Sequence, residues 1–188
     1  MTEEKHKRSV LVPIADGSEE IEAVCIIDVL RRAGAEVTVA SVGEPQITAS
    51  RGVRIIADCT IEACRDRNFD LIALPGGMPG AEHLRDSPTL LAMLRRHQAA
   101  EGLYGAICAA PAVVLSHHGL LEGKRVTGHP AFVDQLRGGQ SVPERVVVDG
   151  RCVTSQGPGT ALEFALTLVA LLYDEAKAAE VAAPMLVA

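Results

Sequence analysis

The sequence predicts a single α/β domain with a mainly parallel sheet covered by helices on both faces. Short apolar segments typical of buried strands alternate with helical segments along the 188 residues, which is the pattern of βαβ units with right-handed crossovers. The composition is 48% hydrophobic but only 3% aromatic, so Val, Leu, Ile and Ala must fill the core, as they do in parallel sheets. The length suits one domain over residues 1–188, and the chain contains no repeat, low-complexity tract or linker.

The amino-terminal half contains three expected strands and two expected helices. Residues 1–8 are polar, and we expect a flexible tail there. Strands are predicted where short runs are apolar and β-prone, at residues 9–14, 36–41 and 69–74. Residues 18–32 have apolar side chains at helical spacing and end before Gly34. Residues 43–58 predict a hairpin, and residues 60–65 predict a short helix.

The carboxyl-terminal half continues the alternation. Residues 88–100 are expected to be helical, residues 103–107 form a buried strand, and helical or turn segments follow as far as residue 137. Two strands, 145–149 and 151–154, flank Asp149 and Gly150, a pair typical of a tight hairpin turn. Residues 159–173 predict the longest apolar helix, and a short alanine-rich helix closes the chain.

Four loops follow the carboxyl ends of the expected strands. These loops are residues 15–18, 75–80, 108–111 and 156–160. Ligands of open α/β sheets bind beyond the carboxyl ends of the strands. We therefore expect the functional site where these four loops meet.

Cys108 is the first candidate for chemistry, because it lies between an expected strand and Pro111. Proline suits the first turn of a helix, so the sulfur should lie near a helix amino-terminus. The free amides and the dipole at that end favour a thiolate, and a tight strand-to-helix turn exposes the side chain as in hydrolase nucleophiles. The alternative is a small cysteine that packs in the core.

Acidic residues open the first expected helix. The helix dipole explains Glu19 and Glu20 without any function. Glu22 differs, because its neighbours one turn along are Cys25 and Ile26 on the apolar side. A half-buried carboxyl has a raised pKa, so Glu22 could stay protonated and hydrogen-bond a thiolate. It could equally act as a general acid or base.

Two further loops supply polar groups. The glycines at 76 and 77 let the backbone approach a ligand closely, and the amides of Gly77 and Ala109 could together form an oxyanion hole. The alternative is a plain turn, since the spacing matches neither a dinucleotide nor a Walker phosphate loop. Of the six histidines, His129 on the loop at residues 127–130 is the best candidate for a base.

Composition argues against several classes of partner. A net charge of −6 and a pI near 5.5 are unlike a nucleic-acid-binding or anionic-membrane-binding surface. No apolar stretch approaches the roughly 20 residues needed to cross a bilayer, and the amino-terminus has no secretory signal. The five cysteines have no close pair at metal-ligand spacing. We therefore expect reduced thiols in a cytoplasmic protein, with neither a metal nor another cofactor.

Five motifs together resemble those of the DJ-1/ThiJ/PfpI superfamily, and of its DJ-1 branch in particular. In order, they are the acidic segment 16–22, the glycine loop 74–77, the cysteine segment 106–111, the loop 127–130 and the segment 154–160. The resemblance covers nearly the whole chain. Residues 180–184 are also similar to an extra carboxyl-terminal helix of that branch.

The resemblance implies a flavodoxin-like, three-layer α/β/α sandwich that forms a homodimer, with its pocket near the interface. Cys108 would be a low-pKa, oxidation-sensitive nucleophile, Glu22 its protonated partner and His129 the nearby imidazole. The Gly77 and Ala109 amides would bind an anion. The remaining site or dimer contacts implied are Gly76, Arg51, which would approach the site across the dimer, and Pro158.

The implied activity is the conversion of methylglyoxal or glyoxal to hydroxy acids without glutathione, or removal of their adducts from proteins. The Cys108 thiolate would form a hemithioacetal with the aldehyde, and Glu22 or His129 would move the protons that give a lactate-like product. The alternative is a redox sensor or stress chaperone controlled by oxidation of Cys108 to the sulfinic acid. A peptidase is disfavoured, because the peptidase-like branch has a histidine where this chain has Ala109.

Overall fold

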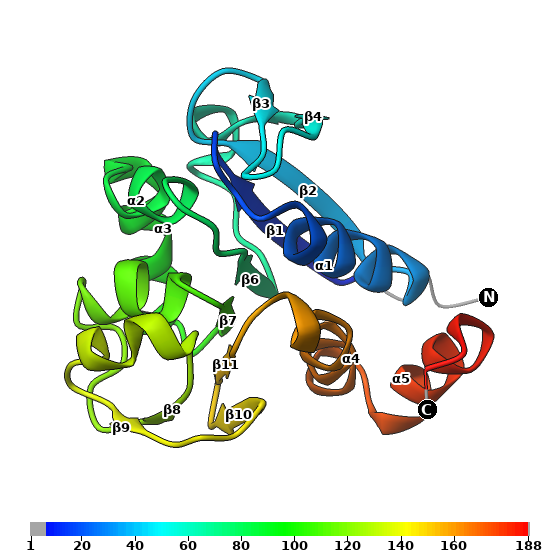
Figure 1. Ribbon diagram of the computed structural model, residues 1–188. Coiled ribbons are helices and arrows are strands. Elements are labelled where there is room, and N and C mark those ends of the chain that lie inside the picture. Colours follow the sequence, from blue (N-terminus) through cyan, green and yellow to red (C-terminus); the bar gives the residue numbers. More distant parts are fainter. Residues whose placement is uncertain (1–6, 188) are drawn as a thin grey trace.

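A seven-stranded sheet lies between two layers of helices (Figure 1) in the computed structural model, which describes residues 7–187. The three-layer, flavodoxin-like sandwich and the mainly parallel sheet are therefore confirmed. Most of the expected tail, residues 1–6, lies outside the described residues. Arg8 already contacts the domain, because its carbonyl accepts a hydrogen bond of 2.8 Å from the Glu36 amide.

The strand order is β10-β11-β7-β6-β1-β2-β5, and β10 at one edge pairs antiparallel with β11 while the other pairs are parallel. The strands are β1 (Ser9–Ile14), β2 (Glu36–Ser41), β5 (Cys59–Thr60), β6 (Leu71–Leu74), β7 (Leu103–Ile107), β10 (Val146–Asp149) and β11 (Cys152–Ser155). The expected hairpin at Asp149 and Gly150 joins β10 to β11, and Gly150 has the positive φ of 59° that such a turn requires.

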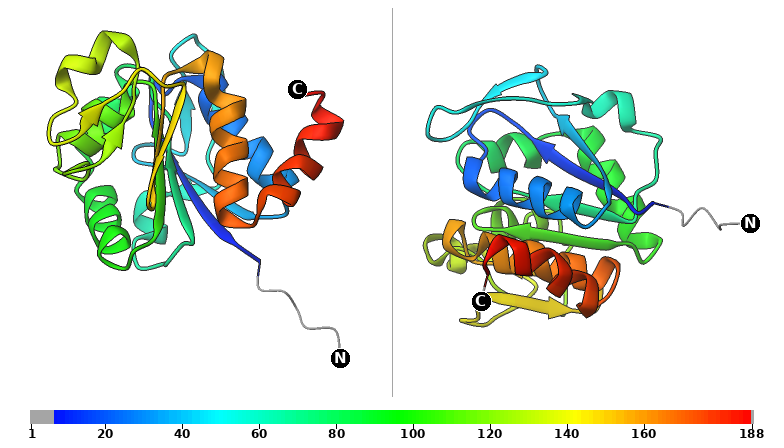
Figure 2. Two further views of the ribbon diagram at one scale, coloured as in Figure 1. Left: turned by 90° about the horizontal axis from the view of Figure 1, so that it is seen from below. Right: turned by 90° about the vertical axis from the view of Figure 1, so that its right-hand side faces the viewer.

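Helices cover both faces of the sheet (Figure 2). One layer holds α1 (Glu20–Arg32), α4 (Ala161–Leu172) and α5 (Glu175–Ala182), with α5 packed on α4. The other holds α2 (Gly80–Arg85), α3 (Pro88–Ala99) and the helical segment Pro111–Ser116. None of the helices described between residues 7 and 187 has the length and apolarity needed to cross a membrane.

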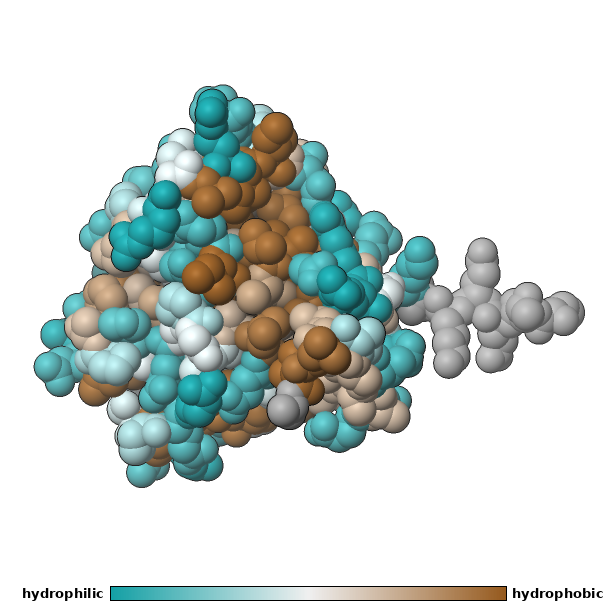
Figure 3. Space-filling view, turned by 45° about the vertical axis from the view of Figure 1, so that its right-hand side comes forward, coloured by the Kyte–Doolittle hydropathy of each residue, from teal (hydrophilic) through white to brown (hydrophobic). Residues whose placement is uncertain are grey.

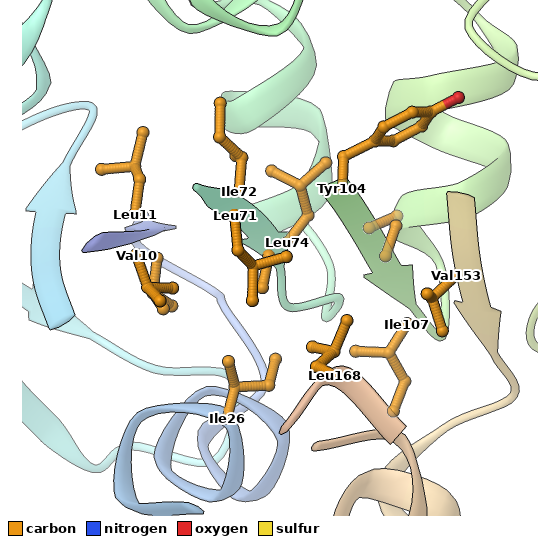
Figure 4. Close-up of a cluster of buried hydrophobic side chains, with 14 of the residues drawn as sticks. Val10, Leu11, Ile26, Leu71, Ile72, Leu74, Tyr104, Ile107, Val153 and Leu168 are labelled. Carbon is orange, nitrogen blue, oxygen red and sulfur yellow. The ribbon is translucent and has the colours of Figure 1, made fainter. Parts of the chain in front are cut away.

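Aliphatic side chains on both faces of the sheet form the core. Figure 4 shows Val10 and Leu71 on the face covered by Ile26 of α1 and Leu168 of α4, whereas Leu11 and Ile72 point to the opposite face. This alternation is the period of two expected for strands, and all of these side chains are at most 1% exposed. Both sheet faces are therefore buried, which explains why the central strands are apolar throughout.

Several element boundaries differ from the prediction for local reasons. The helix expected from residue 18 begins at Glu20, because the Glu19 side chain accepts a hydrogen bond from the Glu22 amide and caps it. The expected hairpin between residues 43 and 58 is present as β3 (Gln46–Thr48) and β4 (Arg54–Ile56). Residues 60–65 form a single 3₁₀ turn, Ile61–Cys64, after the edge strand β5. The elements that the sequence did not predict are β5, α2, β8 (Arg125–Val126) and β9 (Gln140–Ser141).

The four expected loops meet at one end of the sheet because they follow the carboxyl ends of adjacent strands. Hydrogen bonds join two of these loops to residues that flank the other two. The Glu19 amide donates to the Gly76 carbonyl at 2.9 Å, and the Cys108 amide donates to the Ser155 carbonyl at 3.0 Å. The fold therefore assembles the expected site from segments that are far apart in the sequence.

Candidate active site

Cys108 occupies a strained turn at the end of β7. Its φ of 65° lies in the left-handed region that non-glycine residues rarely adopt. Two hydrogen bonds hold this conformation: its amide donates to the Ser155 carbonyl, and its own carbonyl accepts from the His129 amide at 2.8 Å. The helical segment that starts at Pro111 follows at once. The expected strand-to-helix elbow is therefore present, although Cys108 itself is only 9% exposed.

Gly76 and Gly77 bring the glycine loop against this elbow and against the start of α1. A Cβ atom on Gly76 would lie only 2.7 Å from the Cβ of Cys108 and 2.8 Å from the carbonyl oxygen of Ile107. Gly77 has a φ of 87°, and a Cβ there would lie 2.4 Å from the Glu19 amide nitrogen. Side chains at these positions would force the loops apart, which is the physical reason for two glycines here.

Two backbone amides face the Cys108 sulfur. Hydrogen bonds from the amides of Gly77 and Ala109 lower the pKa of the Cys108 thiol, because they stabilise a negative charge on the sulfur. These are the two amides that the sequence nominated for an oxyanion hole. An anion that develops beside the sulfur would lie close to both donors.

The carboxyl group of Glu22 is completely buried beside this thiol. Its Oε2 accepts a hydrogen bond of 2.7 Å from the Gly76 amide, whereas its Oε1 has no hydrogen-bond partner within residues 7–187. Burial raises the pKa of Glu22 to about 7, against the opposing effects of the hydrogen bond from the Gly76 amide and of the adjacent Cys108 thiol. An oxygen without a donor in this position suits a protonated carboxyl, which brings its own donor.

The pKa of Cys108 depends on the charge of Glu22. The pKa of the thiol is raised to about 12, first by burial and then by the negative charge and the hydrogen bond of Glu22, which together outweigh the two amides. This direction is opposite to the one expected from a helix amino-terminus alone. A neutral Glu22 removes the repulsion and turns the carboxyl into a donor toward the sulfur. A thiolate at Cys108 is therefore favoured only while Glu22 is protonated.

Glu20 has a structural role that the sequence did not reveal. Its carboxylate accepts hydrogen bonds of 2.8 Å from the Ser50 hydroxyl and from the Arg51 amide. Burial alone would raise the pKa of Glu20, but these hydrogen bonds outweigh burial and lower it. Glu20 thus fixes the loop that carries Arg51 at the amino-terminal end of α1, and the Arg51 side chain is exposed there. The only sequence signal was a run of acidic residues, which the helix dipole already explained.

The main chain of His129 contacts the elbow, because the His129 amide donates to the Cys108 carbonyl. Its imidazole Nδ1 accepts a hydrogen bond of 3.2 Å from the Ala131 amide, and its ring packs edge-on against Phe132. The ring also borders Gly157, at the start of the loop that contains Pro158. The structure therefore brings His129 and Pro158 to the rim of the site, while the contacts of the imidazole are with these neighbours. No three His, Cys, Asp or Glu side chains in residues 7–187 are grouped so that they could hold a metal ion.

Comparison with known proteins finds the same architecture. Residues 8–171 match the sequence model of the DJ-1/PfpI family. A solved structure described as oxidized DJ-1 from Toxoplasma gondii has 52% sequence identity and a TM-score of 0.94, covering 96% of this chain and 99% of its own.

Two curated relatives differ in how much of their own length the chain spans. Protein DJ-1 homolog B of Arabidopsis thaliana is 48% identical over 95% of this chain, which spans only 41% of that protein. Glutathione-independent glyoxalase DJR-1.2 of Caenorhabditis elegans is 36% identical, and the match covers 95% of each chain. The family match and these relatives agree with the motifs read from the sequence, and the chain belongs to the DJ-1/PfpI family.

Proposed function

We propose that the protein is a glutathione-independent glyoxalase of the deglycase type, acting on methylglyoxal, glyoxal or their protein adducts in defence against carbonyl and oxidative stress. One observation carries the proposal: the Cys108 thiol lies under two backbone amides and beside a buried carboxyl whose pKa is raised to about 7. The name of the nematode relative supports this class of reaction. The five cysteines are free thiols, which agrees with the cytoplasmic location that we propose.

In the proposed reaction, the Cys108 thiolate attacks the aldehyde carbon and forms a hemithioacetal. The amides of Gly77 and Ala109 hold the oxyanion, which takes the proton of Glu22. The resulting Glu22 carboxylate then removes the proton from the former aldehyde carbon, which gives an enediolate. The hydroxyl proton on the first carbon moves to the oxygen of the second carbon, and Glu22 returns its proton to the second carbon. These transfers give a thioester, and water then releases lactate and the thiol. A carboxyl with a pKa near 7 can both give and take the proton at neutral pH.

A turnover assay tests this proposal. Purified protein should consume methylglyoxal without glutathione in an amine-free buffer, and lactate should be the product. If the protein also removes adducts from a glycated peptide, the rate of adduct loss is compared with the rate at which free methylglyoxal is consumed. Faster adduct loss would show that the protein acts on the adduct directly. Adduct loss no faster than the loss of free methylglyoxal would assign the activity to the free aldehyde. Lactate formation no faster than in buffer alone would contradict the proposal.

A redox sensor or stress chaperone is the second candidate function. The same amides that stabilise a thiolate would stabilise the oxygens of a sulfinic acid, and a protonated Glu22 would donate to them. The Toxoplasma gondii structure is described as oxidized, which shows that oxidation has been recorded for a similar protein. In this reading Cys108 should react with peroxide before the other cysteines.

We also propose that the protein forms a homodimer through α1 and the adjacent hairpin. Figure 3 shows a broad band of hydrophobic surface on one side of the molecule. Val24 of α1 and Ile56 of β4 line one groove together and are 49% and 73% exposed, and exposed apolar side chains gathered in this way are typical of an interaction surface. A second copy is the favoured occupant, because the loop that carries Arg51 lies beside the amino-terminal end of the same helix, and Arg51 could then reach the partner's site.

Sedimentation analysis tests the dimer. The wild-type protein should sediment as a dimer, and Val24→Glu should produce monomers because a charge in an apolar interface is left without a partner. Val148→Glu is a matched control, since Val148 on the edge strand β10 is 42% exposed but outside this groove. A monomeric wild-type protein at micromolar concentration, or a dimer that Val24→Glu leaves intact, would refute the assignment.

A further inference from the structure

Two cysteines that the proposed reaction does not use lie together at the edge of the sheet. Cys59 belongs to β5, where it pairs with Ala40 of β2. Thr60 is extended, with φ −83° and ψ 157°, and the next four residues form one 3₁₀ turn that ends at Cys64. This turn brings the chain back on itself: the Cys64 sulfur lies 3.9 Å from the carbonyl oxygen of Thr60, the residue next to Cys59, and the Cys59 side chain is close enough to raise the pKa of Cys64.

The two thiols have different environments. Cys64 is only 1% exposed, and its S–H donates to the Ile61 carbonyl at 3.3 Å. This hydrogen bond fixes the direction of its S–H bond and leaves the sulfur free to meet the Cys59 side chain. Cys59 is partly exposed and packs against the edge of the core. An oxidant in solution therefore reaches Cys59 first, with Cys64 behind it.

The raised pKa of Cys64 agrees with this order. The pKa of Cys64 is raised to about 11, first by burial and then by the neighbouring Cys59 thiol. Because the thiolate is the reactive form, Cys64 is a poor first target for an oxidant. Cys64 is well placed for a second step, the attack on oxidised Cys59, because a nearby sulfur can react quickly even when its pKa is high.

We propose that Cys59 and Cys64 are a reversible dithiol–disulfide site that responds to hydroperoxides independently of Cys108. Cys59 sulfur attacks the peroxide oxygen, so the O–O bond breaks, and one water leaves as Cys59 becomes a sulfenic acid. The Cys64 sulfur then attacks the Cys59 sulfur, the S–O bond breaks, and a second water leaves as the disulfide forms. The two sulfurs lose two electrons in total, and these electrons reduce one peroxide to water.

This chemistry differs from that at Cys108, which has no neighbouring thiol among the groups that shift its pKa. Cys108 can only add oxygen, whereas the pair loses two hydrogens and returns to thiols with a reductant. Intact mass therefore separates the two events. The proposal does not depend on glyoxalase activity, and its failure would leave that activity unaffected.

Peptide mapping after brief treatment with hydrogen peroxide tests the proposal. Trypsin releases both cysteines on one peptide, residues 55–65, because Arg54 and Arg65 flank them. In the wild-type protein this peptide should lose the mass of two hydrogens and regain it with dithiothreitol. Cleavage after Glu62, between the cysteines, should give two pieces that separate only after reduction. A non-reducing gel should show no covalent dimer.

Variants make the result specific. Cys59→Ser should leave Cys64 reduced, and Cys64→Ala, which suits a buried position, should let Cys59 accumulate as sulfenic acid that dimedone traps. Cys25→Ser is the matched control, because Cys25 is also partly buried. Burial and then nearby carboxylates raise the pKa of Cys25, and no second thiol is among the causes. This variant should form the disulfide as the wild-type protein does. The proposal fails if both thiols of peptide 55–65 stay free while Cys108 is oxidised, or if the disulfide joins two chains.

Discussion

Replacing Cys108 with serine should reduce methylglyoxal turnover by at least about 10³-fold, the scale on which loss of a nucleophile acts in other enzymes. A serine hydroxyl is not ionised near neutral pH and has no comparably nucleophilic form, so hemithioacetal chemistry has no counterpart. Serine is close to cysteine in size, and the hydrogen bonds that hold the turn come from the main chain. We therefore expect the free energy of unfolding to change by less than about 1 kcal/mol.

The measurement is kcat/KM for both proteins, with thermal unfolding as a check on the fold. Cys59→Ser is the control, because Cys59 lies on the edge strand β5, outside the glycine loop and the elbow. The redox proposal expects peroxide to add the mass of two oxygens to the wild-type protein, and the Cys108→Ser variant should not show this gain. Turnover that survives the substitution would remove Cys108 from the reaction. Turnover lost together with the fold would instead give the residue a structural role.

The fold could be predicted because strand and helix periodicity is a local property. The runs at residues 9–14, 36–41 and 103–107 match β1, β2 and β7 at both ends. The edge strand β5 could not be predicted. It has only two residues, and its strand geometry comes from pairing with β2 rather than from its own sequence. Very short strands have no periodicity to detect.

The candidate site was predictable to the extent that each residue carries a local signal. Cys108 and Pro111 marked the elbow, and the two glycines marked the close approach of the loop. The pKa of the thiol could not be predicted from the same signals, because it depends on which charge lies opposite in the folded chain. Burial and Glu22 raise that pKa, whereas the nearest amides lower it. Proximity to a helix amino-terminus accounts only for the effect of the amides on the pKa.

The proximity of Cys59 and Cys64 also could not be predicted from the sequence, although the two residues are close along the chain. Their spacing of five positions is unlike a metal motif, and each cysteine alone suggests core packing. Only the 3₁₀ turn, which follows an extended Thr60, brings their thiols together. Residues at this spacing would lie much farther apart in a strand, where each residue advances about 3.3 Å.

Replacing Glu22 with glutamine should lower kcat/KM by roughly 10²-fold, the lower end of the usual contribution of general acid–base catalysis. The amide keeps the size of the side chain and can still accept from the Gly76 amide, but it has no titrating proton to share with Cys108. The activity profile of the wild-type protein should change near pH 7, where Glu22 titrates. That change should be absent from the variant.

The stability of the two proteins should also differ with pH, in a direction fixed by the raised pKa of Glu22. Below pH 4.5 the carboxyl is protonated in both the folded and the unfolded chain. Between pH 4.5 and about 7 the unfolded chain releases the proton while the folded chain retains it, so stability falls as pH rises. At 1.36 kcal/mol per pKa unit, the wild-type protein should lose about 3 kcal/mol relative to Glu22→Gln across this window.

Chemical denaturation of both proteins at several pH values measures this difference, and Glu20→Gln provides the matched control. Glu20 lies two positions earlier, and its pKa is lowered because its hydrogen bonds to Ser50 and Arg51 outweigh burial. Its contribution to stability should therefore be lost as pH falls, which is the opposite sign. Equal pH dependence in the wild-type protein and Glu22→Gln would show that Glu22 is ionised throughout. A permanently charged Glu22 would hold Cys108 as the thiol, and the proposed attack on the aldehyde would then lack its nucleophile.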